Sequence, residues 1–236
     1  MEYYPLYRFG FGLSYTSFEY SNLKIQEKPD GNITVQATVK NTGSRAGDEV
    51  AQLYVTDMYA SVKTRVMELK DFERVHLQPG ESKTVSFELT PYDISLLNDR
   101  MDRVVEKGEF KICVGGMSPD YKANNEIKHS VGFSDKKKGV SGMLDYTHEF
   151  GADFDLSISK VEENLTKNQK TVWVSVKNKG TLMDIGKVEM FVDGKKVGDA
   201  IHYELGAGEE KLIPFKLGKD NKQPVAFTTK YKMVAL

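Results

Sequence analysis

The chain has 236 residues, of which 39% are hydrophobic and 28% charged, so it holds enough apolar material for one large or two small cores. Its 33 basic and 34 acidic residues leave a formal net charge of −1, which offers no basic surface for nucleic acid or anionic membranes. No apolar run approaches the roughly 20 residues of a membrane-spanning helix. We therefore expect no nucleic-acid partner and no membrane partner.

Alternating apolar and polar residues predict β-strands along most of the chain. The clearest stretch is Ile33–Lys40, and it is followed by further strands at residues 50–55, 85–89, 110–114, 172–177 and 188–192. Turn residues bound these stretches. The sequence Gln78-Pro79-Gly80-Glu81 suits a type II turn, and Asp193-Gly194 suits a two-residue hairpin. Many short strands with such turns predict an all-β fold of the sandwich class.

An internal repeat predicts two domains of similar topology. The block VKNTG around Asn41 recurs as VKNKG around Asn178, and a longer block that starts at Leu77 recurs from Leu205. The offset between the copies is 137 residues at the two asparagines and 128 at the second block, so the first copy holds nine extra residues between them. We therefore predict two tandem β-sandwiches.

The stretch between the copies has the composition of a linker. Residues 134–142 are polar, charged and rich in glycine and serine. The predicted organisation is a first domain at residues 1–135, a linker at 136–154 and a second domain at 155–236. The apolar residues within 143–150 could instead form a first strand of the second domain or pack along the junction.

Two residues are predicted to lie in the strand cores. Cys113, the single cysteine, sits in an alternating stretch with no neighbour that would activate a thiol, so we expect a buried and unreactive side chain. A single cysteine also excludes an intrachain disulfide framework. Trp173, the single tryptophan, is predicted as the central core aromatic of the second sandwich.

No motif in the sequence identifies a catalytic, cofactor or metal site. The four histidines lack metal-ligand spacing, and no nucleophile elbow, phosphate-binding loop or dinucleotide fingerprint is present. Glycoside hydrolysis needs a positioned pair of carboxylates, and the 34 acidic residues look like ordinary strand-face and turn residues. We therefore expect no catalytic residue, no cofactor and no metal in this chain.

Aromatic residues crowd the first 20 positions of the chain: Tyr3, Tyr4, Tyr7, Phe9, Phe11, Tyr15, Phe18 and Tyr20. Such density indicates either a patch that stacks on sugar rings or a surface that docks on another domain. We favour docking, and the residues predicted to make the interdomain contact are Tyr7, Phe9, Phe11, Leu13 and Tyr15.

The same N-terminal stretch carries a family resemblance. Residues 5–16, PLYRFGFGLSYT, resemble the segment PLYPFGFGLSYT, which leads into the C-terminal fibronectin type III-like domain of glycoside hydrolase family 3 enzymes, the β-glucosidases and β-xylosidases. The resemblance covers roughly residues 3–133 and continues in Val39–Gly43, Gly47–Val55, Glu68–Val75, Leu77–Thr84 and Val105–Phe110. The chain departs from the pattern at Arg8, Asp71 and Lys107, where the family has proline, glycine and proline.

The resemblance implies a fibronectin type III-like domain that packs on the catalytic domains of a parent glycosidase. Family members carry their nucleophile in a TIM barrel, and this sequence shows none of the alternating strands and helices of a barrel. We therefore expect a non-catalytic C-terminal fragment of a β-glucosidase-like enzyme with a structural, stabilising role. Residues 59–70 resemble the loop that approaches the active site in the family.

Residues 155–236 match no recognised motif and are predicted to be an immunoglobulin-like accessory β-sandwich. The alternative function is a carbohydrate-binding or interaction module that holds polysaccharide near the parent enzyme. The sequence does not fix the compartment, and the resemblance is compatible with a periplasmic or extracellular parent enzyme.

Overall fold

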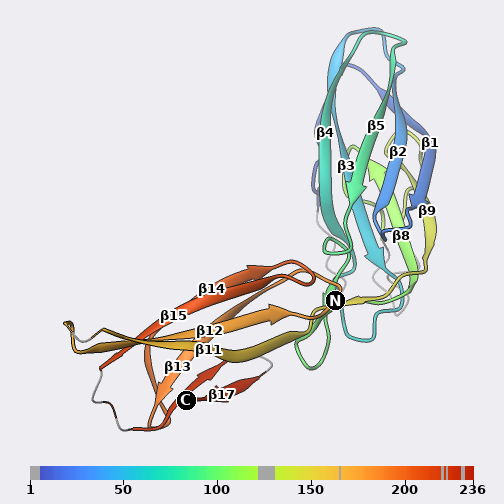
Figure 1. The fold of residues 1–236 in the computed structure, drawn as a ribbon. Coiled ribbons are helices and arrows are strands. Elements are labelled where there is room, and N and C mark those ends of the chain that lie inside the picture. The colour runs from blue at the N-terminus through green and yellow to red at the C-terminus, as the bar shows by residue number, and fades with distance from the viewer. Residues whose placement is uncertain (1–5, 122–130, 165, 219–220, 222, 230–231) are drawn as a thin grey trace. The chain divides into compact units, whose positions relative to one another are not determined.

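The computed structural model describes residues 6–121, 131–164, 166–218, 221, 223–229 and 232–236 (Figure 1). The regular secondary structure of these residues is all β, which confirms the predicted fold class. They contain no helix long and apolar enough to cross a membrane. The chain divides into two compact units. Unit 1 contains residues 1–99 and 105–149, and unit 2 contains residues 100–104 and 150–236.

Unit 1 is a sandwich of two antiparallel sheets. Its three-stranded sheet has the order β1-β2-β5, from Phe18–Glu27, Ile33–Asn41 and Ser82–Leu89. Its four-stranded sheet has the order β4-β3-β8-β9, from Glu68–Leu77, Gly47–Asp57, Gly108–Gly115 and Gly139–Tyr146. Alternate residues of these strands point inward and form the core, because side chains on a strand alternate between its two faces.

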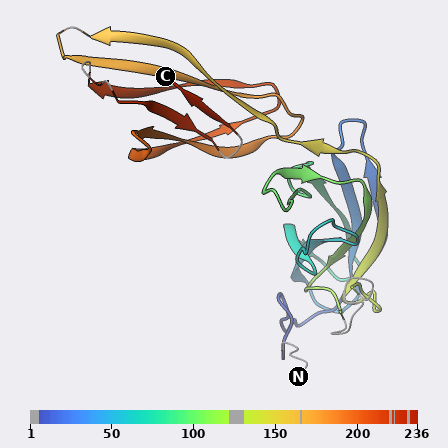
Figure 2. The same cartoon turned by 90° about the horizontal axis from the view of Figure 1, so that it is seen from below.

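Unit 2 repeats this topology strand for strand. Figures 1 and 2 show that it, too, is built of strands. Its three-stranded sheet has the order β11-β12-β15, from Phe154–Asn164, Gln169–Asn178 and Glu210–Gly218. Its four-stranded sheet has the order β14-β13-β16-β17, from Lys195–Leu205, Asp184–Val192, Val225–Thr228 and Met233–Ala235. The remaining short strands are β6 (Leu96–Leu97), β7 (Arg103–Val105) and β10 (Phe150–Gly151).

A buried asparagine from the first copy of the repeat closes one end of unit 1. Asn41 is fully buried, and its Nδ2 donates hydrogen bonds to the carbonyl oxygens of Arg45 (2.8 Å) and Leu77 (2.9 Å). Its Oδ1 accepts the backbone N–H of Gly43 at 3.0 Å. One side chain thereby satisfies three backbone groups that would otherwise be costly to bury.

The second copy of the repeat makes the same arrangement in unit 2. Asn178 is also fully buried, and its Nδ2 donates to the carbonyl oxygens of Leu182 (2.8 Å) and Leu205 (3.1 Å). Its Oδ1 accepts the N–H of Gly180 at 2.9 Å. The repeated asparagine block therefore encodes a repeated structural corner.

The turns between strands have the conformations that the sequence predicts. The extra residues of the first copy of the repeat lie in one of these connections. Asp193 and Gly194 have φ of 50° and 72° and join β13 to β14 in a two-residue hairpin. In unit 1 the equivalent strands, β3 and β4, are joined by the longer connection of residues 58–67. At the predicted type II turn, Gly80 has φ of 79° and the N–H of Glu81 donates to the carbonyl of Gln78 at 3.0 Å.

The predicted linker at 136–154 is wrong for residues 139–146. These residues form β9, which pairs with β8 along its whole length, and Tyr146 is buried and donates its hydroxyl to the carbonyl of Gly31 at 2.7 Å. The glycines that suggested flexibility have a packing role. A Cβ at Gly139 would lie 2.4 Å from the ring of Phe133, so only glycine fits there.

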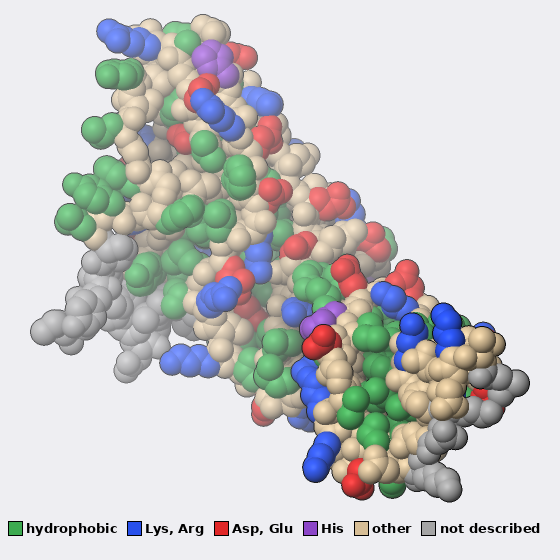
Figure 3. Space-filling model, turned by 90° about the vertical axis from the view of Figure 1, so that its left-hand side faces the viewer, with side chains coloured by type: hydrophobic (Ala, Val, Ile, Leu, Met, Phe, Trp, Pro, Cys, Tyr) green, Lys and Arg blue, Asp and Glu red, His purple; other side chains and the backbone are tan. Residues whose placement is uncertain are grey.

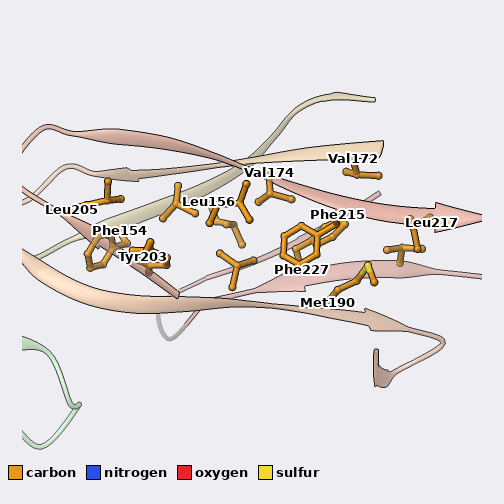
Figure 4. Packing of buried hydrophobic residues seen from close by; sticks show 14 of the residues in the cluster. Phe154, Leu156, Val172, Val174, Met190, Tyr203, Leu205, Phe215, Leu217 and Phe227 are labelled. Atoms are coloured by element: carbon orange, nitrogen blue, oxygen red, sulfur yellow. The ribbon is translucent and has the colours of Figure 1, made fainter. Parts of the chain in front are cut away.

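Trp173 is not the core aromatic that the sequence predicts. Val172 and Val174 point into the core of unit 2, so Trp173 between them lies on the outer face of the sheet and is only partly buried. Figure 4 shows the aromatic residues that do fill this core, Phe154, Tyr203, Phe215 and Phe227. The rings of Phe154 and Tyr203 meet edge to face at 5.1 Å between centroids.

Cys113 is buried, as predicted. Its side chain is 1% exposed in β8, and burial raises the pKa of the thiol. A neutral, buried thiol of this kind acts as a small hydrophobic side chain.

Candidate docking segment

Residues 6–15, which precede β1 and which we call the N-terminal segment, expose an unusual number of large hydrophobic side chains. All five predicted docking residues are exposed, from 47% for Phe11 to 97% for Leu13, and Leu6 is exposed as well. Hydrophobic side chains that project from the surface are visible in Figure 3. The rings of Tyr7 and Phe11 stack at 5.1 Å between centroids, so part of this surface is already ordered.

The other aromatic residues of the N-terminal cluster differ from these. Phe18 and Tyr20 belong to β1 and point into the core of unit 1, where they are 5% and 0% exposed. Tyr3 and Tyr4 lie outside the described residues. Sequence density alone therefore did not separate the exposed aromatic residues from the buried ones.

The N-terminal segment is anchored in its middle. The carbonyl of Phe9 accepts a hydrogen bond from the N–H of Ser118 at 2.8 Å, and Arg8 forms an ion pair with Asp120. Gly10 has φ of 81°, and a Cβ at this position would lie 2.2 Å from Nε2 of Gln52. Glycine is therefore required here both for the backbone conformation and for the close approach.

A buried polar network supports this anchor. Gln52 is 5% exposed, and its Nε2 donates to the carbonyl of Gly116 at 3.1 Å. Its Oε1 accepts the hydroxyl of Tyr54 at 2.6 Å. Burial raises the pKa of Tyr54 to about 12, so this hydroxyl remains a donor at neutral pH. These two hydrogen bonds fix the Gln52 side chain, against which Gly10 packs.

A second anchor holds the end of the N-terminal segment where it meets β1. Thr16 Oγ1 donates to Oδ1 of Asn41 at 2.6 Å, and the N–H of Thr42 donates to the carbonyl of Ser17 at 2.8 Å. A Cβ at Gly43 would lie 2.2 Å from Thr16 Oγ1. The repeated Asn-x-Gly turn therefore has a further role in unit 1, because it fixes the exit of the exposed segment.

The loop predicted at residues 59–70 to approach an active site has fewer distinctive features than the N-terminal segment. Residues 68–70 belong to β4, so the connection itself is residues 58–67. Its backbone is tied at Ser61, whose N–H donates to Glu106 at 2.9 Å, and it exposes Tyr59 at 64%. An approach to an active site remains a prediction for this loop.

The described part of the chain contains no group of three or more His, Cys, Asp or Glu side chains placed to hold a metal ion. The features that the structure brings together in unit 1 are apolar side chains on a fixed backbone. Such an arrangement suits recognition of another protein surface.

Comparison with known proteins shows what unit 1 is similar to. Residues 49–118 match the fibronectin type III-like domain family. A β-xylosidase from Formosa agariphila is 49% identical over 117 residues, and the thermostable β-glucosidase B from Acetivibrio thermocellus is 44% identical over 128. These matches cover 48% and 52% of the chain. They span only 16% and 17% of the two relatives.

Solved structures agree with this assignment. The structure of β-glucosidase 3B from Thermotoga neapolitana in complex with glucose is 34% identical, with a TM-score of 0.50. The match covers 62% of this chain and 18% of that chain. Residues 155–236 lie outside the stretch that matches the domain family, and their immunoglobulin-like class stays a prediction.

Proposed function

We propose that unit 1, whose residues 49–118 are a fibronectin type III-like domain, is an accessory module of a β-glucosidase- or β-xylosidase-type enzyme. In this proposal unit 1 docks on the catalytic domains through the N-terminal segment and stabilises them. The matching region makes up only 16% and 17% of the two glycosidases named above, which supports a place beside catalytic domains.

The observation that carries the proposal is the combination of exposure and anchoring in the N-terminal segment. Burying a Leu or Phe side chain is favourable by about 1.5–3 kcal/mol, so an exposed row of them gains free energy from a partner surface. The hydrogen bonds at Phe9 and Thr16 hold the backbone before any partner binds. Less conformational entropy is then lost on docking.

A chimeric enzyme tests the proposal. The region of the Acetivibrio thermocellus β-glucosidase that matches this chain is replaced by unit 1, and thermal inactivation of β-glucosidase activity is followed. We expect Tyr7→Ser with Phe9→Ser and Phe11→Ser to lower the inactivation temperature by about 5 °C or more.

Phe72→Ser is the matched control, because Phe72 is an exposed aromatic residue of unit 1 outside the N-terminal segment, at 65% exposure. It should leave the inactivation temperature of the chimera unchanged. Equal inactivation temperatures for the triple variant and the parent chimera would contradict docking through this segment.

A further inference from the structure

The outer face of the β11-β12-β15 sheet in unit 2 carries an aromatic residue in a central position. Trp173 lies on β12, the middle strand, opposite Lys160 on β11 and opposite Pro214 on β15. Pro214 lacks an N–H, which an edge strand such as β15 tolerates. The indole is therefore flanked by the apolar pyrrolidine ring of Pro214 on one side and by the long cationic side chain of Lys160 on the other.

Polar groups are fixed around the indole. Trp173 Nε1 donates to Oε2 of Glu162 at 2.9 Å, and Lys160 Nζ donates to Oε1 of the same carboxylate at 2.6 Å. Lys160 Nζ also lies over the indole ring, 5.1 Å from its centroid, in a cation–π contact. These hydrogen bonds outweigh desolvation and hold the pKa of Glu162 below its ordinary value. The cluster thus contains an aromatic ring, an ammonium group and a carboxylate, and the charges of the last two cancel.

A β-bulge creates this juxtaposition. The register between β11 and β12 shifts between Ile158 and Lys160, which brings Lys160 opposite Trp173 and Glu162 opposite Thr171. Bulges commonly re-aim side chains at functional positions. Unit 1 has a shift at the corresponding place of β1, between Ser21 and Lys24, so the backbone arrangement is common to both units.

Unit 1 shows that the sandwich itself does not require an aromatic residue at this position. The residue equivalent to Trp173 is Gln36, which lies opposite Lys24 on β1 and Ser86 on β5. Gln36 Nε2 lies 3.5 Å from Ser86 Oγ in a purely polar surface. The same face of the same topology is thus hydrophilic in unit 1 and aromatic in unit 2.

We propose that Trp173, Lys160 and Glu162 form a binding platform for a neutral polysaccharide. In this proposal the Lys160 ammonium group turns away from the indole to donate a hydrogen bond to a sugar hydroxyl, one sugar ring stacks on the indole in its place, and the Glu162 carboxylate accepts a hydrogen bond from another hydroxyl. A pyranose has an apolar face of C–H groups and a rim of hydroxyls, which matches a flat ring bordered by one donor and one acceptor. Paired charges favour a neutral ligand over an ionic one.

This platform lies wholly in unit 2 and is independent of docking by unit 1. Its test uses the full chain, in which Trp173 is the single tryptophan and therefore the source of indole fluorescence. We expect a saturable change of fluorescence on titration with cellohexaose or xylohexaose. In native gels we expect soluble glucan or xylan to retard the chain.

Trp173→Ala should weaken the retardation by about tenfold or more, and Glu162→Gln by a smaller factor. Trp173→Phe, which keeps a smaller ring, should retain part of the binding, and circular dichroism verifies that each variant is folded. Gln36→Ala, at the equivalent position of unit 1, is the control and should bind like the parent. Absence of both signals with the parent chain up to about 10 mM oligosaccharide, or equal retardation of the Trp173→Ala variant, would overturn the proposal.

Discussion

Units 1 and 2 have the same strand order but present different surfaces. Each closes one end with a fully buried asparagine, Asn41 or Asn178, that bonds two carbonyl groups. Unit 1 adds an anchored, exposed hydrophobic segment before its first strand, and unit 2 adds an aromatic platform on its three-stranded sheet. The comparison separates what the sandwich needs, which both units share, from what each unit adds to it.

The strongest test of this separation compares core and surface aromatic residues. Phe18 and Phe154 occupy equivalent positions opposite the two buried asparagines, and both are buried. We expect Phe18→Ala and Phe154→Ala each to destabilise its unit by about 4 kcal/mol. Trp173→Ala should cost only about 1 kcal/mol, because the indole is outside the core.

Urea unfolding followed by circular dichroism gives these values, and Trp173 fluorescence assigns the transition of unit 2 in variants that keep the indole. A loss for Trp173→Ala as large as that for Phe154→Ala would show that the indole supports the fold. The surface role inferred from the Gln36 comparison would then lose its basis.

The paired asparagines provide the next test. Asn41→Ala or Asn178→Ala leaves buried backbone groups without partners, and each such group costs about 1–3 kcal/mol. We expect about 3 kcal/mol of destabilisation in either unit. Lys40→Ala and Lys177→Ala are matched controls, since these neighbours are exposed and should cost less than about 0.5 kcal/mol. Markedly different losses for the two asparagines would break the equivalence of the two corners.

The two buried asparagines show which parts of the fold can be predicted from the sequence alone. The VKN-x-G repeat and the alternation of residues 33–40 and 172–177 predicted the paired topology correctly, because strand period and turn chemistry are local properties. The same alternation also contained the correct position of Trp173. The valines at 172, 174 and 176 share the inward face, and Trp173 between them must face outward.

Features that depend on distant contacts were not predictable in the same way. The glycines of β9 resembled a linker because their packing partner, Phe133, is identifiable only in the folded chain. The aromatic residues of the N-terminal segment are exposed, and docking through them stays a prediction. The residues that anchor this segment, Ser118 and Asp120, come from positions that no local pattern connects to it.

A steric test addresses a position where the units differ inside the core. Gly186 faces Tyr203 in unit 2, whereas the equivalent pair in unit 1 is Glu49 and Val75. A Cβ at Gly186 would lie 2.3 Å from the Tyr203 hydroxyl, so Gly186→Ala should cost about 2 kcal/mol through overpacking. Gly218→Ala, with open space around its Cβ, should change stability by less than about 0.5 kcal/mol. Equal stability of both variants in urea would contradict the close packing.

The smallest expected effect is a pH dependence confined to unit 1. His148 Nδ1 lies 2.5 Å from Oε1 of Glu27, and its Nε2 lies 3.1 Å from the carbonyl oxygen of Pro29. Both ring nitrogens face acceptors, so the imidazolium satisfies both. The hydrogen bond that His148 donates to Glu27 outweighs desolvation and raises the pKa of His148 above 6.5, and Asp30 acts in the same direction. Burial opposes ionisation of Glu27, but hydrogen bonds from His148 and Thr147 lower its pKa below 4.5.

The two shifts define a pH window. The contribution of His148 is complete below about pH 6.5 and is lost as the pH rises through its raised pKa. The contribution of Glu27 is present above about pH 4.5 and is lost as the pH falls through its lowered pKa. We therefore expect the melting temperature of unit 1 to fall between pH 5.5 and pH 8.5, by no more than about 2 °C for a pair this close to solvent. His148→Gln should remove that difference, while His202→Gln in unit 2 should preserve it, and an unchanged pH dependence in the His148 variant would show that other groups cause it.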